Sequence, residues 1–428
     1  MKVLVLGSGG REHAIADTLY RQGHEVFCLP GNGGTGLISK TVPTIDPYNF
    51  PVLIEWVKEE KIDLTVCGPE MYLEKGIADA FSDQGLKLFG PKKAAAKLES
   101  SKAYAKQFME KHQIPTADFI LCHSYEEATS NLDHYFSLWN GVVVKPDGLT
   151  GGKGVFCCTT LDEAIKAIKE ISLDKRYGEA GECIILEKLL VGKEVSLLAF
   201  CDGKSMVPLL PAQDYKRLLD DNQGPNTGGV GAYVRPDFYT TNMHEQVMET
   251  IVRSTMEGLN NEKLEYCGVL YFGLMITEEG PFVLEYNCRF GDPETQALLP
   301  LIDSDLGKIF EACCSGKLDS SMVVWEPKYS CCVVMYSGGY PDHFQIGYAV
   351  HGLETLEKRK EIRIFHAGTQ RDELGHVTTA GGRVFGMTGL GETQEEAIEH
   401  AYSAVEEIGF YNANFRRDIA GGLLAFRK

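Results

Sequence analysis

The stretch "VLEYNCRFGDPETQ" (283–296) joins a strand-like run of residues to a dense group of polar side chains. Strand alternation places Glu285 and Asn287 on one face, and their oxygens suit a Mg²⁺ ion that phosphates also hold. Arg289 lies two residues further on, where it can share that face and bind an anion. The turn that follows carries Asp292, Glu294 and Thr295 around Pro293. A cluster of this density is typical of a functional site and seldom occurs at an ordinary strand end.

A second informative stretch is the glycine-rich loop "VVVKPDGLTGGKGVF" (142–156), which joins two strand-like runs. It is not a Walker loop, because its glycine spacing is one residue short and Gly154 stands where Ser or Thr is required. Lys145 leaves the first strand as a point charge for phosphate oxygens. The loop has more glycines than a structural hairpin needs: Gly148, Gly151, Gly152 and Gly154. We predict a flexible flap that closes over phosphates, with a floppy surface loop as the alternative.

The polar segment "AQDYKRLLDDNQGPNTGGVGAY" (212–233) fits no regular element. Its first part carries Asp214, Lys216 and Arg217, and its loop carries Gly224, Gly228, Gly229 and Gly231. Long loops inside compact domains are usually functional, so we expect this one to line a site. A solvated insertion is the alternative.

The N-terminal stretch "KVLVLGSGGREHAIA" (2–16) consists of an aliphatic strand, a glycine turn and the start of a helix. Unpaired N–H groups at such a helix N-terminus can bind an anion. A dinucleotide fingerprint does not fit, because Glu12 replaces its third glycine and the second strand ends without an acidic residue. Either Gly9, Gly10 and Arg11 hold a single phosphate, or the glycines only serve a tight turn. This stretch alone leaves both readings open.

Residues 1–90 alternate strand-like and helical runs, which predicts a parallel, doubly wound sheet. The expected strands are 2–6, 25–29, 63–67 and 86–89, and the expected helices are 11–22, 48–60 and 72–84. Ligands of such sheets bind at the carboxyl ends of the strands. We therefore expect the glycine turns at 7–10, 31–34 and 68–70 to gather on one rim.

The rest of the chain is also of mixed α/β character. A lysine-bearing helical stretch at 91–114 leads into a small unit with strands at 141–145, 154–158 and 183–187. Longer strands follow at 194–201, 268–277 and 281–287, up to a polar, linker-like segment at 316–330. The last α/β module has strands near 332–336, 361–365 and 382–387 and a helix at 393–408.

Composition narrows the class of protein. The chain has 428 residues, enough for two to four domains, and a formal net charge of −18, which argues against a general nucleic-acid binder. No window approaches the roughly 20 apolar residues that span a bilayer, and the N-terminus reads as a strand rather than a signal peptide. The 13 cysteines lack C-x-x-C and zinc spacings, which favours free thiols in a reducing compartment. We expect a cytoplasmic protein with neither nucleic-acid nor membrane partners.

Together, these motifs resemble the phosphoribosylamine–glycine ligase family (glycinamide ribonucleotide synthetases) of the ATP-grasp superfamily. The segments that carry the resemblance are "GGREHA" (9–14), "GPE" (68–70), "KPDGLTGGKGV" (145–155), "GPNTGGVGAY" (224–233), "EYNCRFGDPETQ" (285–296), "HAGT" (366–369) and "GGRV" (381–384). The resemblance implies an α/β ATP-grasp fold with an N-terminal doubly wound parallel-sheet domain and a C-terminal α/β module. The expected units are a substrate-binding domain at 1–100, an ATP-grasp domain at 101–330 with a lid at about 122–192, and a C-terminal domain at 331–428.

The resemblance also implies a reaction of purine biosynthesis. ATP phosphorylates the carboxylate of glycine to an acyl phosphate, and the amine of 5-phosphoribosylamine attacks it. The products are glycinamide ribonucleotide, ADP and phosphate, and catalysis is mostly positioning and charge neutralisation. The alternatives are an ATP-grasp ligase with another amine acceptor and a non-catalytic nucleotide-binding relative. A monomer or weak homo-oligomer is expected.

By the same resemblance, individual residues acquire expected roles. Glu285 and Asn287 bind the Mg²⁺ (or Mn²⁺) that bridges the ATP phosphates. The triphosphate is held by Lys102 or Lys106, by Lys145 and by the flap residues Gly148, Gly151, Gly152, Lys153 and Gly154. Glu187 lies at the hinge that receives adenine, and Glu194 lies near the ribose. Arg289, backed by Asp214, orients glycine and steadies the acyl phosphate. The remaining substrate-binding residues are Gly9, Gly10, Arg11, Glu12, Glu70, Lys216, Asp292 and Thr295.

The chain departs from the family pattern at Met71, Tyr72, Pro146, Thr150, Gly151, Tyr215 and Val230. Pro146 and the extra glycine at 151 bear on the movement of the flap, whereas Tyr215 lies near an expected substrate site. The strand "VLYFGLMIT" (269–277) precedes the E-x-N strand and carries no acidic residue, which leaves the number of metal ions open.

Overall fold

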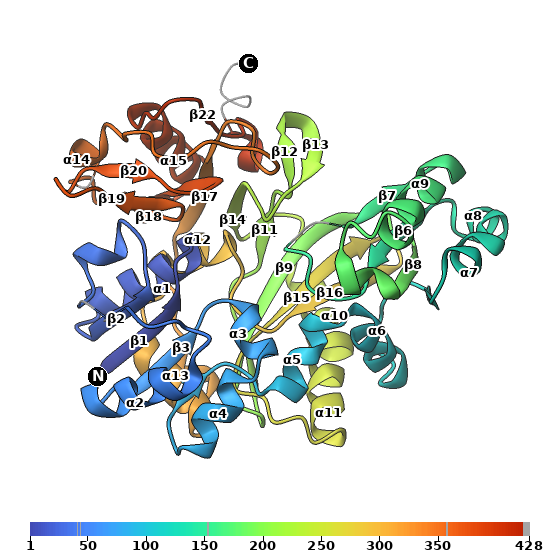
Figure 1. Cartoon of the computed structure of the whole chain (residues 1–428), viewed down its shortest axis with the longest axis horizontal. Helices are drawn as coiled ribbons and strands as arrows, with labels where there is room; N and C mark the ends of the chain where they lie inside the picture. The colour runs from blue at the N-terminus through green and yellow to red at the C-terminus, as the bar shows by residue number, and fades with distance from the viewer. Residues whose placement is uncertain (41, 43, 152–153, 357, 423–428) are drawn as a thin grey trace.

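The computed structural model describes residues 1–40, 42, 44–151, 154–356 and 358–422. Their β structure consists of two four-stranded sheets, a ten-stranded sheet and two short hairpins. In Figure 1 the N-terminal sheet, the central sheet and the C-terminal strands form the body of the molecule. The second four-stranded sheet extends from this body on the right as a lid.

The N-terminal sheet has the strand order β2–β1–β3–β4, and all its pairs are parallel. Its strands are β1 Lys2–Gly7, β2 Glu25–Pro30, β3 Leu64–Cys67 and β4 Leu88–Phe89, and its helices are α1 Gly10–Arg21, α2 Phe50–Glu60, α3 Glu70–Glu74 and α4 Ile77–Asp83. Val3 and Val5 pack into one hydrophobic cluster, whereas Leu4 and Leu6 pack into another on the opposite face. Burial on both faces explains why β1 reads as a continuous aliphatic run, and the predicted parallel sheet is confirmed.

One predicted helix of this region is divided in two. The pattern predicts a single helix over 72–84, but α3 ends at Glu74 and α4 begins at Ile77. Gly76 between them has a φ of +87°, in the left-handed region that ends helices.

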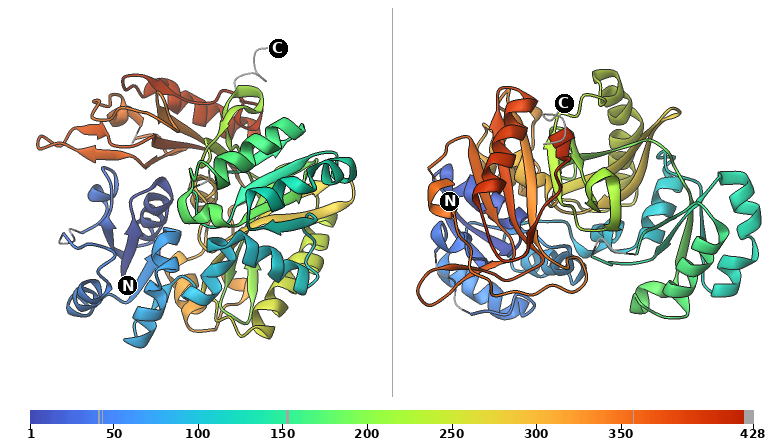
Figure 2. Two further views of the ribbon diagram at one scale, coloured as in Figure 1. Left: turned by 45° about the vertical axis from the view of Figure 1, so that its right-hand side comes forward. Right: turned by 90° about the horizontal axis from the view of Figure 1, so that it is seen from above.

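The lid is an antiparallel sheet with the order β5–β8–β6–β7. Its strands are β5 Phe119–Cys122, β6 Val142–Pro146, β7 Phe156–Cys158 and β8 Ile184–Lys188, and its helices are α7 Tyr125–Ser130, α8 Leu132–Trp139 and α9 Leu161–Ser172. Two helices, α5 Lys93–Ser100 and α6 Lys102–Lys111, connect it to the N-terminal domain. The antiparallel pairing of β6 with β7 confirms that the glycine-rich loop joins two strands of a hairpin. Figure 2 shows the lid standing apart from the N- and C-terminal regions.

The central sheet has the order β16–β15–β9–β11–β14–β17–β21–β18, with β10 beside β9 and β22 beside β17. Its strands are β9 Lys193–Cys201, β10 Met206–Pro208, β11 Ala212–Asp214, β14 Gly231–Val234, β15 Gly268–Thr277, β16 Gly280–Asn287, β17 Tyr329–Ser337, β18 Ile362–His366, β21 Arg383–Gly391 and β22 Ala413–Asn414. The hairpins are β12 Arg217–Leu219 with β13 Gln223–Asn226 and β19 Thr369–Arg371 with β20 Val377–Thr379. The associated helices are α10 Thr241–Val247, α11 Arg253–Asn261, α12 Glu294–Leu298, α13 Leu306–Cys314, α14 Leu353–Leu356 and α15 Gln394–Glu407.

The C-terminal strands continue this central sheet. β14 pairs with β17 in antiparallel register, so that Gly231 lies opposite Val333. The C-terminal α/β module expected after the polar segment at 316–330 therefore shares backbone hydrogen bonds with the strands before it. This continuity places C-terminal side chains beside the loops that carry the predicted site.

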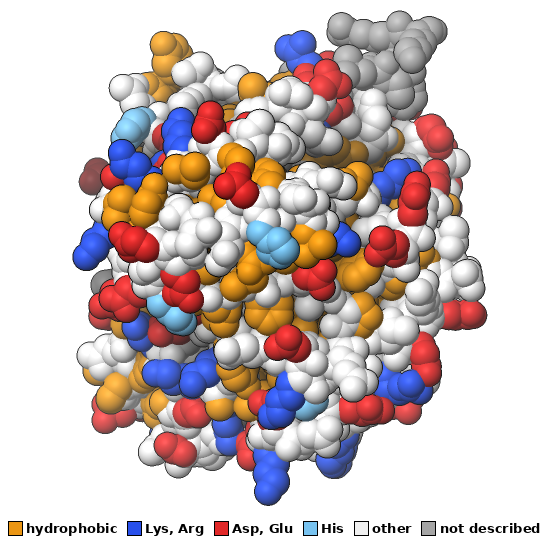
Figure 3. Space-filling view, turned by 90° about the vertical axis from the view of Figure 1, so that its right-hand side faces the viewer, with side chains coloured by type: hydrophobic (Ala, Val, Ile, Leu, Met, Phe, Trp, Pro, Cys, Tyr) orange, Lys and Arg blue, Asp and Glu red, His pale blue; other side chains and the backbone are white. Residues whose placement is uncertain are grey.

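The surface and composition features are ordinary. No helix among the described residues is long and apolar enough to cross a membrane. Acidic and basic side chains are interspersed on the face drawn in Figure 3. All thirteen cysteines carry free thiols.

Candidate active site

The three glycine turns of the N-terminal sheet meet at its carboxyl rim. The amide of Gly31 donates to the Gly7 carbonyl over 3.2 Å, and the amide of Gly68 donates to the Leu6 carbonyl over 3.1 Å. Asn32 Nδ2 donates to the carbonyl of Ser8 over 2.9 Å. The predicted gathering of these turns on one rim is confirmed.

Glu12 explains why the first turn lacks a third glycine. Its carboxylate is buried, accepts the Gly9 amide over 2.7 Å and pairs with Arg11 Nε over 2.6 Å. Arg11 also donates to the Phe290 carbonyl over 3.0 Å. A Cβ at Gly68 would lie 2.1 Å from Glu12 Oε1, so glycine is needed where this carboxylate fills the rim. A phosphate at this turn must therefore replace or adjoin the contacts that Glu12 already makes.

Arg289 lies between two carboxylates. Its Nε pairs with Glu70 over 3.3 Å, and its Nη2 pairs with Glu99 over 3.1 Å and donates to Asn287 Oδ1 over 3.3 Å. Burial raises the pKa of Glu99 to about 7, against the opposing effect of Arg289. Burial also disfavours ionisation of Glu70, but Arg289 and Arg11 hold its pKa below the ordinary value.

Asp214 does not support Arg289 as the sequence predicted. Among the residues that the structure describes, Arg289 forms ion pairs with Glu70 and Glu99. Asp214 lies at the end of β11, where its Oδ1 is buried without a hydrogen-bond partner among the described residues. Burial and the nearby Glu294 raise its pKa well above the ordinary value. The correction follows from tertiary packing, because these residues belong to different elements and no local pattern records which carboxylate reaches the guanidinium.

Glu285 and Asn287 share a face of β16, as strand alternation predicted. They lie opposite Gly273 and Tyr271 of β15. Lys216 Nζ lies 3.3 Å from Glu285 and 3.5 Å from Glu194. Lys216 is the main cause that lowers the pKa of Glu285 to about 2, so this carboxylate is ionised at neutral pH.

These donors fit Mg²⁺ bound together with phosphates. A carboxylate and an amide oxygen are hard ligands, and Mg²⁺ completes its shell with water and substrate oxygens instead of a protein cage. Among the residues that the structure describes, no group of three or more His, Cys, Asp or Glu side chains could hold a metal. An ion at Glu285 and Asn287 therefore depends on oxygens that a phosphorylated ligand supplies.

Lys106 of α6 and Lys145 of β6 lie on either side of a second buried carboxylate. Glu187 pairs with Lys106 over 2.9 Å and with Lys145 over 2.8 Å, and all three side chains are buried. Burial works against ionisation of Glu187, but the two lysines hold its pKa below the ordinary value. Lys106 also donates to Thr116 Oγ1 over 2.8 Å. The carboxylate of Glu187 therefore pairs with two lysines, and its place at an adenine-binding hinge stays a prediction.

Lys102 reaches the flap itself. Its Nζ donates to the Gly148 carbonyl over 2.6 Å, and burial lowers its pKa. Asp147 anchors the base of the flap, because it accepts the Ser101 hydroxyl and the Ala103 amide over 3.1 Å each. Three flap glycines have positive φ: Gly148, Gly151 and Gly154. The predicted residues Gly152 and Lys153 lie outside the described residues.

Two residues of the turn after β16 are engaged in the protein itself. Thr295 is fully buried and donates its hydroxyl to the Gly291 carbonyl over 2.6 Å. Asp292 accepts from Gln296 Nε2 over 2.7 Å and pairs with Arg383 over 3.3 Å. Thr295 therefore stabilises the turn of α12, and a direct substrate contact of its hydroxyl is not supported by this geometry.

Three family models match the chain in sequence. They are the phosphoribosylglycinamide synthetase N domain over residues 1–99, the ATP-grasp (A) domain over 100–295 and the C domain over 330–422. The chain belongs to the phosphoribosylglycinamide synthetase family. It is an ATP-grasp ligase of purine biosynthesis, and the resemblance drawn from the motifs is confirmed.

Relatives in the phosphoribosylglycinamide synthetase family match nearly the whole chain. The phosphoribosylamine–glycine ligase of Caldanaerobacter subterraneus is 43% identical over 99% of this chain and 100% of that protein. The enzyme of the same name from Escherichia coli K12 is 42% identical over 98% of each. The crystal structure of phosphoribosylamine–glycine ligase from Thermotoga maritima has a TM-score of 0.82 and 32% identity, covering 98% of this chain and 100% of that one. A Campylobacter jejuni biotin carboxylase, with a TM-score of 0.73 and 12% identity over 97% of this chain and 92% of that one, shares the fold.

Two charged residues near the site, Glu99 and Arg383, have no role predicted from the sequence. Glu99 comes from α5 and reaches Arg289, but a glutamate in an ordinary helical stretch gives no signal of its destination. Arg383 comes from β21 and lies in the "GGRV" segment, which the motifs singled out without a role.

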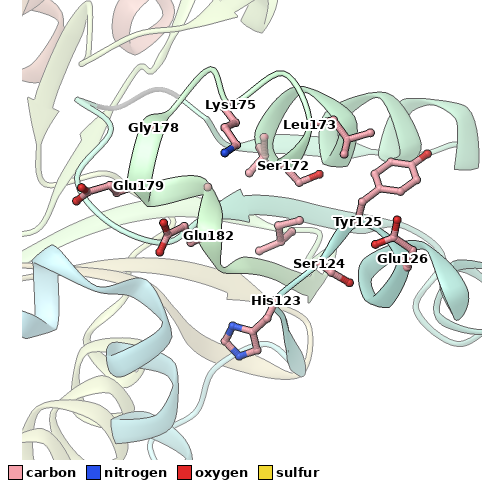
Figure 4. A pocket seen from close by; sticks show the side chains of 13 residues that line it. His123, Ser124, Tyr125, Glu126, Ser172, Leu173, Lys175, Gly178, Glu179 and Glu182 are labelled. Carbon is pink, nitrogen blue, oxygen red and sulfur yellow. The ribbon is translucent and has the colours of Figure 1, made fainter.

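A separate hollow of about 490 Å³ lies in the lid, between the start of α7 and the segment 171–184. Figure 4 shows its lining, which includes His123, Glu126, Lys175, Glu179 and Glu182. Among the residues that the structure describes, none of the predicted site residues lines this hollow. The hollow is therefore distinct from the site built around Glu285 and Arg289.

Proposed function

We propose that the chain joins glycine to 5-phosphoribosylamine, using ATP and passing through glycyl phosphate. The observation that carries the proposal is the position of the ionised Glu285 between the two sides of the site. On one side Lys102 and Lys145 reach it electrostatically, and on the other Asn287 contacts Arg289. A nucleotide and a small carboxylate can thus meet at the end of β16. The relatives that are named phosphoribosylamine–glycine ligases support this choice of substrates.

On the nucleotide side, the chain supplies positive charge and a cover. Lys102 and Lys145 neutralise phosphate oxygens, while the flap at 148–154 excludes water from the acyl phosphate. Mg²⁺ (or Mn²⁺) held by Glu285 and Asn287 would neutralise further charge on the phosphates when bound. Lys216 Nζ lies 3.3 Å from Glu285. From this position it can stabilise the negative charge on the carboxylate of glycine and on the transferred phosphoryl group.

On the acceptor side, Arg289 orients the carboxylate of glycine, and the rim formed by the glycine turns receives phosphoribosylamine. Glu70 and Glu99 fix the guanidinium plane of Arg289 from two directions. A positioned carboxylate and amine react as if at high local concentration, which is the main contribution expected of this side. The cytoplasmic location and the monomeric or weakly associated state stay predictions.

A coupled assay of ADP release tests the proposal. Glycine and freshly generated phosphoribosylamine are each omitted in turn, and full turnover is expected only when both are present. Turnover with phosphoribosylamine replaced by another amine would indicate an ATP-grasp ligase with a different acceptor. Nucleotide binding without phosphate release from any acceptor would indicate a non-catalytic relative.

A further inference from the structure

Arg383 extends from the first position of β21 into loops of the ATP-grasp region. Its Nη1 donates to the carbonyls of Gly228 over 2.8 Å, Gly229 over 3.1 Å and Asp292 over 2.8 Å. Its Nη2 pairs with the Asp292 carboxylate over 3.3 Å. One guanidinium from the C-terminal region therefore joins two turns that are more than sixty residues apart in the sequence.

The first of these turns passes close to Asp214 and to Pro293. Gly229 has a φ of +106°, and a Cβ there would lie 2.7 Å from Asp214 Oδ1 and 2.4 Å from Pro293 Cδ. A second C-terminal side chain supports the same turn, because the Gly228 amide donates to Tyr340 Oη over 3.3 Å. The turn therefore lies between Asp214 and Pro293, and its position sets the space around both.

The second turn reaches the acceptor rim. A Cβ at Gly9 would lie 3.2 Å from Asp292 Oδ2, the oxygen that pairs with Arg383. Burial disfavours ionisation of Asp292, but Arg383 and Arg11 hold its pKa below the ordinary value. Arg383, Asp292 and the first glycine turn thus form a continuous set of contacts from the C-terminal strands to the N-terminal sheet.

A guanidinium is suited to this task for a physical reason. Three carbonyl oxygens that converge on one point repel one another unless a donor with several N–H groups lies between them. Nη1 of Arg383 serves the three carbonyls while Nη2 pairs with the Asp292 carboxylate, whereas a lysine ammonium has its three donors on one nitrogen and cannot serve both positions in this way. We propose that Arg383 is a positioning residue that holds the Gly228–Gly229 turn against the Asp292–Pro293 turn and thereby sets the acceptor side of the site. The catalytic part of this inference rests on the proposed function.

The kinetic test compares Arg383→Met, Arg383→Lys and the unaltered chain. We expect Arg383→Met to raise KM for phosphoribosylamine about tenfold, since several bonds to a charged group are lost. KM for ATP should stay within about twofold, because the lysines around Glu187 do not contact Arg383. Arg383→Lys should recover part of the loss. The matched control is Arg363→Met, because Arg363 on β18 donates only to the carbonyls of Lys360 and Ile362 among the described residues.

A second measurement does not depend on activity. Amide hydrogen exchange in peptides covering 226–231 and 291–294 should become faster in Arg383→Met and remain unchanged in Arg363→Met. Unchanged exchange in both segments would overturn the inference, whatever the ligase assay shows. Equal rises in KM for ATP and phosphoribosylamine would also overturn it, because they indicate general structural damage. Absence of ligase activity in the unaltered chain would instead contradict the proposed function and leave the exchange result to decide the role of Arg383.

Discussion

The two sides of the site contain charge triads of opposite composition. On the lid, one carboxylate, Glu187, lies between Lys106 and Lys145. On the acceptor side, one guanidinium, Arg289, lies between Glu70 and Glu99. With all groups ionised, the first triad has a net charge of +1 and the second a net charge of −1. The lid triad favours a polyanion such as a triphosphate, whereas the acceptor triad favours a ligand that carries an ammonium group beside its carboxylate, as glycine does.

The two triads also differ in the pKa values of their carboxylates. Both lysines in the lid triad are fixed by a carboxylate that is ionised, because they keep the pKa of Glu187 below the ordinary value despite burial. In the acceptor triad, burial brings the pKa of Glu99 to about 7. The acceptor side can therefore change its charge near neutral pH.

The largest effect is expected where the two sides meet, at Glu285. Glu285→Ala should lower turnover on the order of a thousandfold, because it removes the ionised carboxylate that we propose as a metal ligand and leaves Lys216 without that partner. The unfolding midpoint should change little, because the carboxylate is partly exposed. Steady-state ADP release and thermal unfolding measure the two effects. Normal turnover in Glu285→Ala would show that the metal assignment is wrong, and Glu278→Gln at the far, exposed end of the same hairpin is the control.

The next effect comes from neutralising the lid triad. Lys145→Met should lower turnover about a hundredfold and destabilise the lid by about 2 kcal/mol, since Glu187 keeps only Lys106 as a buried partner. Urea unfolding and ADP release at saturating glycine give the two values. Lys166→Met, at an exposed position of α9, is the control from the same lid. A stability loss without a loss of turnover would assign Lys145 to the fold alone.

The acceptor triad is tested through pH. The pKa of Glu99 is about 7 in the folded chain and near its ordinary value of 4.5 in the unfolded chain, so the folded state retains a proton that the unfolded state releases. The free energy of unfolding should therefore fall as pH rises from about 5 to about 7, by about 2 kcal/mol from this group. Glu99→Gln should remove that part of the fall. Identical pH profiles for Glu99→Gln and the unaltered chain would contradict the assignment, and Glu110→Gln on the exposed face of α6 serves as the control.

These triads mark what the sequence could predict and what it could not. The parallel N-terminal sheet, the β6–β7 hairpin and the shared face of Glu285 and Asn287 follow from strand alternation and glycine turns, which are local signals. The partners of Arg289 are not local, because Glu70 and Glu99 come from α3 and α5. The continuity of the C-terminal strands with the central sheet is also non-local, since the pairing of β14 with β17 joins segments about a hundred residues apart. Side-chain partners across such distances are decided by tertiary packing.

The smallest effect is expected at Thr295, where the observed hydrogen bond favours a role in the fold over the predicted substrate contact. The polar turn suggested a substrate contact, but the hydroxyl donates to the Gly291 carbonyl four residues earlier and is fully buried. Thr295→Val should therefore cost about 1 kcal/mol of stability and leave KM for glycine and phosphoribosylamine within about twofold. The matched control is Thr18→Val, because Thr18 makes the same bond to the Ala14 carbonyl in α1. Similar stability losses in both variants, with unchanged KM values, would assign Thr295 to the fold, whereas a selective rise in either KM would return it to the substrate site.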